Sequence, residues 1–355
     1  MKGTIMRNTL RGQDFINLRD LTPDQFRYLL DLAHTLKAEK RAGVDQRRFV
    51  GKNVMAQFEW SSTRTRCAFE TSCNDLGIGF TYLSNSHVGV QETVKDTIRV
   101  FSEMYDAIVW RSQGPERFMY EIAEYADIPV INALTTEDHP TQMLADAMTL
   151  EELWGGAGSC KGKKMAYLGA AAIEPLWYGR MCAYMGMDLY VIGPDLYDHK
   201  MLPEYVQELE ETFAKHAPHN KLIISDDLSL LKGMDVLTTE EWEYTNSSTG
   251  DDHGYDSWMH YAKELIPYRL TSELMEIVDN PDCIVLHMLP SLHNADHSLG
   301  RQLVEQAPTQ EARNLIVSGL EISDELFEKH AHEIFREAGN RQHTIKAVLT
   351  ACIGC

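Results

Sequence analysis

The chain has 355 residues, and its 53 acidic and 33 basic side chains give a formal net charge of −20 at pH 7. A chain this acidic repels nucleic-acid phosphates and anionic membranes over most of its surface, so we expect no nucleic-acid partner and no membrane partner. No apolar run approaches the roughly 20 residues of a membrane span, and residues 1–20 lack the apolar core of a signal peptide. We therefore expect a cytoplasmic protein of two domains.

Helices and strands alternate along the first half of the chain. Thr22 and Pro23 open an amphipathic helix that we predict over residues 21–40. Strands are predicted at residues 52–58, 79–83, 107–111 and 129–132, and helices at 94–104, 115–125 and 141–153. This alternation is typical of a parallel sheet with crossover helices.

Four glycines between residues 155 and 162 mark a domain junction, after which the alternation starts again. Strands are predicted at residues 164–169, 188–192, 221–225, 236–239 and 283–286, with a helix near 177–185. We predict an α/β fold of two domains, each a parallel sheet flanked by helices, joined by interdomain helices. The first is residues 1–154, completed by a C-terminal helix over 338–355, and the second is residues 155–337.

The seven cysteines are scattered, which fits reduced thiols better than a disulfide framework. Cys352 and Cys355 form a Cys-x-x-Cys pair at the very end of the chain. Because redox and metal motifs normally lie in a structured turn, we expect no such role for this pair.

The most informative segment follows the first predicted strand, where residues 61–66 read Ser-Ser-Thr-Arg-Thr-Arg. Hydroxyl groups and arginine forks there meet the free N–H groups of a helix start, a combination that suits a phosphate. The alternative is an ordinary polar turn in which Ser62 is the N-cap and the arginines are solvated. The alternation of hydroxyls and arginines favours the phosphate interpretation.

Four further segments lie where loops should follow strands or where helices should begin. They are Arg111, the run His139-Pro140-Thr141-Gln142, the run His287-Met288-Leu289-Pro290, and the run Asn340-Arg341-Gln342-His343-Thr344, which we expect to open a C-terminal helix. Each alone has an ordinary explanation, such as an ion-paired arginine, a capping histidine or a chain reversal at proline. Their order along the chain makes them informative together.

In this order the segments resemble those of the aspartate/ornithine carbamoyltransferase family, and more particularly its ornithine branch. The resemblance covers almost the whole chain and includes residues 61–66, 89–99, 104–111, 139–146, 287–293 and 340–347. It implies transfer of the carbamoyl group of carbamoyl phosphate to an amine, most closely the side-chain amine of L-ornithine, giving L-citrulline and phosphate. It also implies an active site between the domains and a homotrimer or a multiple of trimers, with residues 84–91 near a neighbouring subunit.

The resemblance also implies roles for individual residues. The implied carbamoyl-phosphate site would be made of Ser62, Thr63, Arg64, Thr65, Arg111, His139, Gln142, Leu289 and Arg341, most of them in the first domain. The residues implied in catalysis are Thr65, Arg111, His139 and His287. Within the site, residues 62–65 would hold the phosphate with Arg111, and Thr65, Arg111 and His139 would surround the carbamoyl oxygen. Gln142 would hold the carbamoyl NH2, Arg341 would close the pocket, and the Leu289 carbonyl would face the carbamoyl nitrogen or the incoming amine.

These residue types suit the implied reaction. Its tetrahedral intermediate places negative charge on the former carbonyl oxygen while the phosphate keeps its own charge, so fixed donors and cations are the main catalytic requirement. The phosphate itself can accept the proton of the amine. We therefore expect no metal and no cofactor.

The second domain, implied to bind the amine acceptor, departs from the family pattern. Residues 169–174 read Gly-Ala-Ala-Ala-Ile-Glu where the ornithine branch usually has Gly-Asp-x-x-Asn-Asn, so Glu174 stands near an asparagine that contacts ornithine. Glu240 opens an altered loop whose continuation over 243–250 is longer and more acidic, Met288 replaces a cysteine, and Trp60 in the first domain replaces a lysine. The acceptor residues would be Glu174, Glu240, Met288 and Leu289.

These departures leave alternatives open. The first is drift within an ornithine enzyme, and the second is an acidic loop that is merely solvated. The third is a changed acceptor, because glutamates favour a cationic amine or guanidine over a zwitterionic amino acid. A non-catalytic carbamoyl-phosphate-binding paralogue is a further alternative. A nicotinamide dehydrogenase is disfavoured, because Gly169-Ala170-Ala171-Ala172 does not supply the Gly-x-Gly-x-x-Gly fingerprint.

Overall fold

The computed structural model describes residues 10–84, 86–112, 114–196, 199–242 and 255–354. Its internal contacts divide the chain into two compact units. Unit 1 contains the residues up to Ser159 together with those from Ala338 onward, and unit 2 contains Cys160–Glu337. Among the described residues, no helix has both the length and the apolar character needed to cross a membrane. The six described cysteines form no disulfide, and Cys355 lies outside the described residues.

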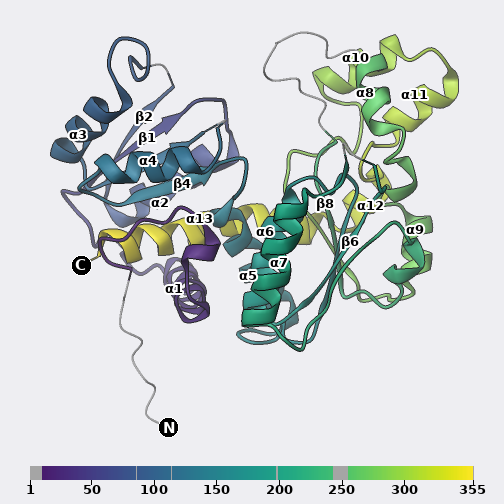
Figure 1. The fold of residues 1–355 in the computed structure, drawn as a ribbon, viewed down its shortest axis with the longest axis horizontal. Coiled ribbons are helices and arrows are strands. Elements are labelled where there is room, and N and C mark those ends of the chain that lie inside the picture. Colours follow the sequence, from purple (N-terminus) through teal and green to yellow (C-terminus); the bar gives the residue numbers. More distant parts are fainter. Residues whose placement is uncertain (1–9, 85, 113, 197–198, 243–254, 355) are drawn as a thin grey trace. The chain divides into compact units, whose positions relative to one another are not determined.

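Unit 1 contains a four-stranded parallel sheet with the strand order β2-β1-β3-β4 (Figure 1). The strands are β1 (Asn53–Phe58), β2 (Gly79–Leu83), β3 (Ala107–Arg111) and β4 (Val130–Leu134). The helices are α1 (Pro23–Arg41), α2 (Arg64–Leu76), α3 (Val94–Met104), α4 (Arg117–Tyr125), α5 (Pro140–Trp154) and most of α13 (Ala331–Ile353), with a short 3-10 helix at Leu18–Asp20. Thr22 and Gln25 form a capping box that fixes the start of α1.

The connections in unit 1 change direction at β1. The chain passes from β1 to β2 on one side, then returns to β3 on the other side of β1 and continues to β4. Right-handed crossovers therefore put α2 on one face of the sheet and α3 and α4 together on the other, where α3 and α4 contact each other. The carboxyl ends of β1 and β3 border the switch point, which is where open α/β sheets bind ligands.

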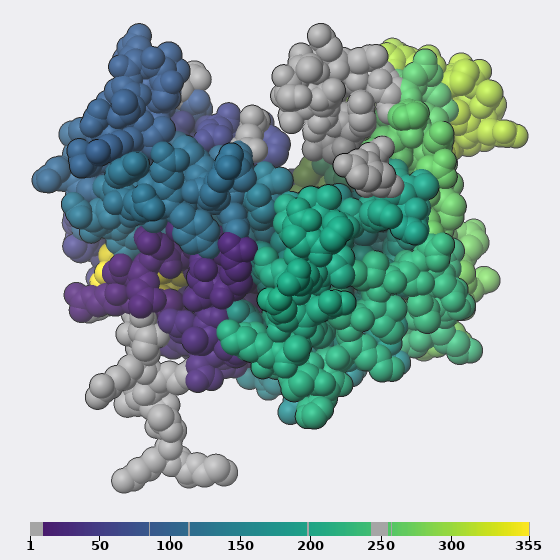
Figure 2. Space-filling model, viewed as in Figure 1, coloured from purple at the N-terminus to yellow at the C-terminus, as the bar shows by residue number. Residues whose placement is uncertain are grey.

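Unit 2 contains a five-stranded parallel sheet with the order β7-β6-β5-β8-β9. The strands are β5 (Lys164–Leu168), β6 (Asp188–Ile192), β7 (Leu222–Ser225), β8 (Val236–Thr239) and β9 (Ile284–His287). The helices are α6 (Glu174–Met185), α7 (Pro203–His216), α8 (Tyr255–Ala262), α9 (Ser272–Val278), α10 (Ser298–Gln306), α11 (Gln310–Val317) and α12 (Asp324–Lys329), with 3-10 helices at Leu228–Leu231 and Ile266–Tyr268. In Figure 2 the teal segments that include α7 form much of the near face of this unit.

The switch point of unit 2 lies between β5 and β8. The chain moves from β5 through β6 to β7 on one side, and then places β8 and β9 on the other side of β5. A core of buried apolar side chains from β5, β6, β8 and β9 covers the sheet together with α9 and α12. The carboxyl ends of β5 and β8 therefore border the second candidate position for a ligand.

The predicted fold class is confirmed, since both sheets are parallel and flanked by helices. One local prediction is wrong. The C-terminal helix begins at Ala331 instead of opening at Asn340, because Gly339 does not interrupt the helix formers on either side of it. In the alternative interpretation of the turn after β1 the N-cap was Ser62, whereas the N-cap of α2 is Thr63, whose side chain makes no capping hydrogen bond.

Candidate functional site

In unit 1, hydrogen bonds join the carboxyl ends of β1 and β3 and the residues that follow them. Phe58 pairs with Arg111 in the sheet, and the N–H of Glu59 donates to the Arg111 carbonyl at 3.1 Å. The Glu59 carboxylate then accepts hydrogen bonds from Nε1 of Trp110 at 2.8 Å and from Oγ of Ser112 at 3.1 Å. These bonds hold the segment after β1 beside Arg111, at the switch point of the sheet.

The N-terminus of α2 is suited to an anion. The first turn contains no acidic residue, and the side chain of the N-cap residue Thr63 makes no capping hydrogen bond. The dipole and the N–H groups at this end therefore favour a negatively charged ligand. Of the predicted phosphate residues, Thr65 is buried, Ser62 and Arg64 are half-buried and Thr63 is exposed.

Arg341 of α13 is hydrogen-bonded to two other predicted residues, Thr65 and Gln142. Its guanidinium is almost completely buried and donates to Oε1 of Gln142 and to Oγ1 of Thr65, the latter at 3.0 Å. It also donates to Oγ1 of Thr141 at 3.2 Å. Thr65 on α2, Gln142 on α5 and Arg341 on α13 are thus brought together from positions far apart in the sequence.

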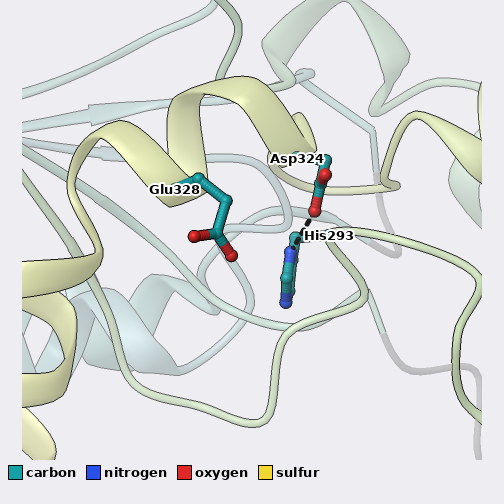
Figure 3. Close-up of side chains that lie close together, drawn as sticks. All are labelled: His293, Asp324 and Glu328. Carbon is teal, nitrogen blue, oxygen red and sulfur yellow. Dashed lines mark hydrogen bonds and ion pairs between the residues drawn. The ribbon is translucent and has the colours of Figure 1, made fainter.

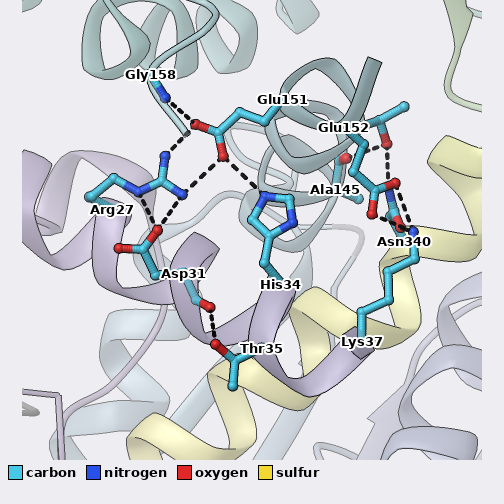
Figure 4. A network of polar contacts seen from close by, with 11 residues as sticks. Arg27, Asp31, His34, Thr35, Lys37, Ala145, Glu151, Glu152, Gly158 and Asn340 are labelled. Atoms are coloured by element: carbon cyan, nitrogen blue, oxygen red, sulfur yellow. Dashed lines mark hydrogen bonds and ion pairs between the residues drawn. The ribbon is translucent and has the colours of Figure 1, made fainter. Parts of the chain in front are cut away.

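Lys37 and Asn340 hold α13 against its neighbours next to Arg341 (Figure 4). Nζ of Lys37 donates to Oε1 of Glu152 at 2.6 Å and to Oδ1 of Asn340 at 2.5 Å, and Nδ2 of Asn340 donates to Oγ1 of Thr149 at 2.8 Å. Lys37 is on α1, and Thr149 and Glu152 are on α5. This buried network determines where the arginine that follows Asn340 lies.

His139 is a buried histidine of unit 1 on which the charges of three predicted arginines act. It is buried at the N-cap of α5, where its side chain makes no capping hydrogen bond. Burial lowers the pKa of His139 well below 6.5, and the charges of Arg341, Arg111 and Arg64 lower it further. His139 is therefore a neutral imidazole among three predicted arginines, a place that attracts an anion.

Arg66 is not part of this group, although its place in the Ser-Thr-Arg-Thr-Arg run suggested a phosphate role. It is exposed, its guanidinium lies 3.9 Å from the ring centre of Tyr82, and it is 3.8 Å from the carboxylate of Glu70. Arg111 instead lies over the ring of Trp60 at 5.0 Å, so the tryptophan found at the usual lysine position packs against a predicted site arginine.

Two neighbours of Gln142 were not predicted as site residues. Nε2 of Gln142 donates to Oδ1 of the buried Asp146 at 2.8 Å while its oxygen accepts from Arg341, so both ends of the amide are oriented. Thr141 shares Arg341 with Thr65. Both residues lie in the motif over 139–146, and the i, i+4 spacing between Gln142 and Asp146 was a signal that could have identified Asp146.

Two of the altered residues of unit 2, Glu174 and Glu240, follow strands that border its switch point. Burial raises the pKa of Tyr167, near the end of β5, well above 10, and the negative charges of Glu174 and Glu240 raise it further. Burial also raises the pKa of Glu174, against the effect of N–H groups at the start of α6. Gly169 has φ +113, and a Cβ there would meet Nε1 of Trp242 at 3.0 Å. The loop over 243–250 lies outside the described residues.

The segment after β9 carries His287, Met288 and Leu289. His287 and Met288 are buried and Leu289 is half-buried. Nδ1 of His287 accepts a hydrogen bond from the N–H of Leu289 at 3.1 Å, and the Leu289–Pro290 peptide bond is cis. Leu289 has φ +38, a left-handed backbone that leucine rarely adopts.

One group among the described residues has the donor types for a metal ion, namely His293, Asp324 and Glu328, whose ligand atoms lie within 4.8 Å of one another (Figure 3). Nδ1 of His293 is hydrogen-bonded to Oδ1 of Asp324 at 2.7 Å. His293 also stacks on the ring of Phe327, with ring centres 3.7 Å apart. These contacts account for the placement of the imidazole without an ion.

Comparisons with known protein families match nearly the whole chain to two domains of one family. Residues 13–152 match the aspartate/ornithine carbamoyltransferase carbamoyl-P binding domain, and residues 161–352 match the Asp/Orn binding domain of the same family. The chain belongs to the aspartate/ornithine carbamoyltransferase family. Arg64, Arg111 and His139 therefore lie in the part described as carbamoyl-P binding, whereas Glu174, Glu240 and also Arg341 lie in the part described as Asp/Orn binding.

Individual carbamoyltransferases are similar over nearly their full length. The chain is 38% identical to an ornithine carbamoyltransferase of Pediococcus pentosaceus, covering 98% of this chain and 100% of the relative. It is 35% identical to a catabolic ornithine carbamoyltransferase of Haemophilus influenzae, with the same coverage of both chains. An ornithine carbamoyltransferase structure from Pyrococcus furiosus has a TM-score of 0.80 at 26% identity, covering 97% of this chain and 98% of that one.

Proposed function

We propose that this carbamoyltransferase moves the carbamoyl group of carbamoyl phosphate to the side-chain amine of L-ornithine, giving L-citrulline and phosphate. The observation that carries the proposal is the neutral, buried His139, on which the charges of Arg64, Arg111 and Arg341 act, together with an N-terminus of α2 that has no acidic residue in its first turn. Full-length similarity to proteins named ornithine carbamoyltransferase supports the choice of donor and acceptor.

In the proposed donor complex, Ser62, Thr63, Arg64 and Thr65 hold the phosphate with the N–H groups of α2, and Arg111 assists them. Thr65, Arg111 and His139 surround the carbamoyl oxygen. Because His139 is neutral, it donates a hydrogen bond to this oxygen without adding charge in the ground state, while the arginines stabilise the charge that develops. Gln142, oriented by Arg341 and Asp146, accepts a hydrogen bond from the carbamoyl NH2 through its oxygen.

The proposed reaction has two bond changes. The amine nitrogen forms a bond to the carbamoyl carbon, and the bond between that carbon and the bridging phosphate oxygen breaks. The departing phosphate accepts the proton of the amine, so the step needs no side-chain base. The Leu289 carbonyl accepts a hydrogen bond from the attacking amine or the carbamoyl nitrogen, and His287 acts through Leu289, whose N–H it binds. The residues of this chain therefore supply binding, orientation and charge.

A second acceptor class is favoured by one observation. Glu174 and Glu240 both act on Tyr167 at the switch point of unit 2, so the candidate acceptor position is acidic. Acidic groups attract a diamine or a guanidine compound more strongly than they attract the carboxylate of an amino acid. We therefore include these cations as the alternative acceptors.

A panel of amines tests the function directly. The protein is mixed with carbamoyl phosphate and, separately, ornithine, lysine, putrescine, agmatine and guanidine, and the carbamoylated product is measured by mass together with phosphate release. Citrulline from ornithine alone supports the main proposal, whereas a product only from putrescine, agmatine or guanidine replaces it. Carbamoyl-phosphate binding without any product would indicate a non-catalytic paralogue.

We also propose that the protein assembles as a homotrimer or a multiple of trimers, on the basis of its family membership. Sedimentation velocity at micromolar concentration tests this directly. A mass of three chains or a multiple of three is expected, and a stable monomer or dimer would contradict the proposal.

A further inference from the structure

A single buried carboxylate holds the loop that follows β9. We define the β9 loop as residues 287–294, and Glu321 lies shortly before α12. The Glu321 side chain is fully buried. Its Oε1 accepts hydrogen bonds from Oγ of Ser291 at 2.8 Å and from the N–H of Leu292 at 2.6 Å, and it lies 3.2 Å from Nε2 of His287. These three contacts go to both ends of a six-residue stretch whose middle contains Leu289.

His287 extends the influence of Glu321 to Leu289. Because Nδ1 of His287 accepts from the N–H of Leu289, the ring proton lies on Nε2, which is 3.2 Å from Oε1 of Glu321 but makes no hydrogen bond to any described residue. Leu289 keeps its φ of +38 only if its surroundings determine that backbone. Its carbonyl accepts no hydrogen bond from any residue that the structure describes, so this acceptor is available to a ligand.

The residues around Glu321 reinforce the same loop. The N–H of Leu320 donates to the Leu292 carbonyl at 2.9 Å, and Oδ1 of Asp324 lies 2.7 Å from Nδ1 of His293 (Figure 3). Gly319 runs so close to the loop that a Cβ there would meet the His293 carbonyl oxygen at 2.6 Å. Residues 319–324 therefore run along the second half of the β9 loop, and Glu321 alone among their side chains reaches back to its first half.

We propose that Glu321 is a positioning residue for carbamoyl transfer, which orients the Leu289 carbonyl toward the attacking amine by binding the loop on both sides of it. The inference rests on the proposed function, because it assigns the Leu289 carbonyl a part in that reaction. A carboxylate suits this task, since one of its oxygens can accept more than one hydrogen bond from neutral donors, as Oε1 of Glu321 does from Ser291 and Leu292. The nearby charge of Arg269, which acts on Glu321, offsets the cost of burying it.

The test compares Glu321→Gln and Glu321→Met with a control, Glu328→Gln, which makes the same kind of change at an exposed position of α12. Gln keeps one carbonyl acceptor for Ser291 or Leu292, whereas Met fills a similar volume and accepts essentially nothing. We measure kcat and KM for the amine, the Kd of carbamoyl phosphate by calorimetry, and the hydrogen exchange of the backbone amides of β9 and its loop.

We expect kcat/KM for ornithine to fall about 10-fold in Glu321→Gln and about 100-fold in Glu321→Met, mainly through kcat, as a misplaced reacting group predicts. The Kd of carbamoyl phosphate should stay within about twofold, because the arginine group lies in unit 1. Amide exchange should become faster at Leu289 and Leu292 while Ile284–Leu286 stay protected, which also shows that unit 2 remains folded. Glu328→Gln should match the wild type in every measurement.

The outcomes separate the inference from the function on which it rests. If the wild type makes citrulline and Glu321→Met keeps its kcat/KM, or loses donor affinity equally, the positioning role is wrong and the function stands. If the wild type makes no carbamoylated product, the proposed function fails, and the positioning role in that reaction fails with it. Hydrogen exchange then decides the structural part alone: faster exchange confined to the loop supports the anchoring by Glu321, and unchanged exchange overturns that too.

Discussion

The two units use the same architectural position for opposite charges. In unit 1 the carboxyl ends of β1 and β3 lie beside Arg64 and Arg111, which surround His139 together with Arg341. In unit 2 the carboxyl ends of β5 and β8 are followed by Glu174 and Glu240, which act on Tyr167. A parallel sheet thus provides a place for a ligand at its switch point, whereas the loop side chains decide which ligand it attracts.

The charge of the whole chain conceals this division. Residues 201–280 contain 17 acidic and 5 basic side chains, so 17 − 5 = 12 of the 20 excess negative charges belong to one stretch of unit 2. The site arginines come from three separate segments and form a positive group only where α2, β3 and α13 meet. Net charge therefore excludes a generally anionic partner, but it says little about a local anion site.

The largest effect is expected from Arg64→Ala, which removes one of the three cations around His139. Binding of carbamoyl phosphate by calorimetry should weaken by at least about 100-fold, because an arginine fork on a phosphate forms strong charge-assisted hydrogen bonds. Arg66→Ala is the matched control two residues away, and it should bind normally because Arg66 stacks on Tyr82. Near-normal affinity in Arg64→Ala would contradict the assignment of a carbamoyl-phosphate site to the arginine group of unit 1.

His139→Asn tests whether the neutral imidazole takes part in the chemical step. We expect kcat to fall on the order of 100-fold, as for loss of one donor to a developing oxyanion. Because burial and the arginines hold the pKa of His139 well below 6.5, the imidazole does not titrate near neutrality. The logarithms of kcat for wild type and variant should therefore run parallel between about pH 6 and pH 8. A wild-type transition near pH 6.5 that the variant lacks would contradict this.

Glu174→Gln and Glu240→Gln test whether the acidic switch point of unit 2 binds the amine acceptor. Each should change kcat/KM for the amine by about 10-fold with little change in carbamoyl-phosphate affinity, because the charge lost lies at the switch point of unit 2. Whether kcat/KM falls or rises in these variants identifies the acceptor. Loss of a glutamate charge should slow the reaction of a purely cationic amine, whereas it should speed the reaction of a zwitterion whose carboxylate lies near that glutamate. Glu204→Gln on the exposed side of α7 is the control. If each variant reacts with every amine at the same rate as the wild type, these glutamates have no role in binding the acceptor.

The smallest effect on binding is expected from Glu151→Gln, which should instead change stability. Glu151 is buried at the end of α5 and accepts from Arg27, His34 and the N–H of Gly158 (Figure 4). Burial alone would raise the pKa of Glu151, but these contacts outweigh it and lower the pKa to about 2. The variant should lose on the order of 3 kcal/mol of unfolding free energy at pH 7 and keep its donor affinity.

The pH dependence of this loss has a definite sign. A carboxyl group whose pKa is lower in the folded state stabilises the protein above its unfolded pKa of about 4.5, and this contribution disappears as the pH falls toward 2. Denaturant unfolding of wild type and Glu151→Gln should therefore differ at pH 7 and converge through this acidic range. A difference independent of pH would show that the contacts of Glu151 act through packing instead of charge.

Local patterns in the sequence were sufficient for most elements and for the main donor residues. The predicted strand at 79–83 and helix at 94–104 coincide with β2 and α3, because apolar periodicity and neighbouring caps depend on short-range contacts. The start of α13 at Ala331 was missed because the helix was placed from the run that begins at Asn340, whereas the packing of α13 tolerates Gly339 inside the helix.

Other features depend on which segments meet. Arg64 and Arg66 are equivalent in the motif, yet only Arg64 contributes to the charge around His139. Helical direction decides this, since side chains two residues apart point to different sides of α2. Glu321 belongs to no motif, and its contacts with Ser291, Leu292 and His287 join segments about 30 residues apart.

The sequence alone therefore determined the α/β class, the two alternating halves, the family, and the residue types that a carbamoyl-phosphate site requires. These follow from composition, periodicity and motif order, each of which is a property of neighbouring residues. Only the tertiary structure decided that Arg341 binds Thr65, Thr141 and Gln142, that His139 is neutral, and that Glu321 holds the loop of Leu289. Burial, charge and hydrogen-bond geometry between distant segments exist only once the chain has folded.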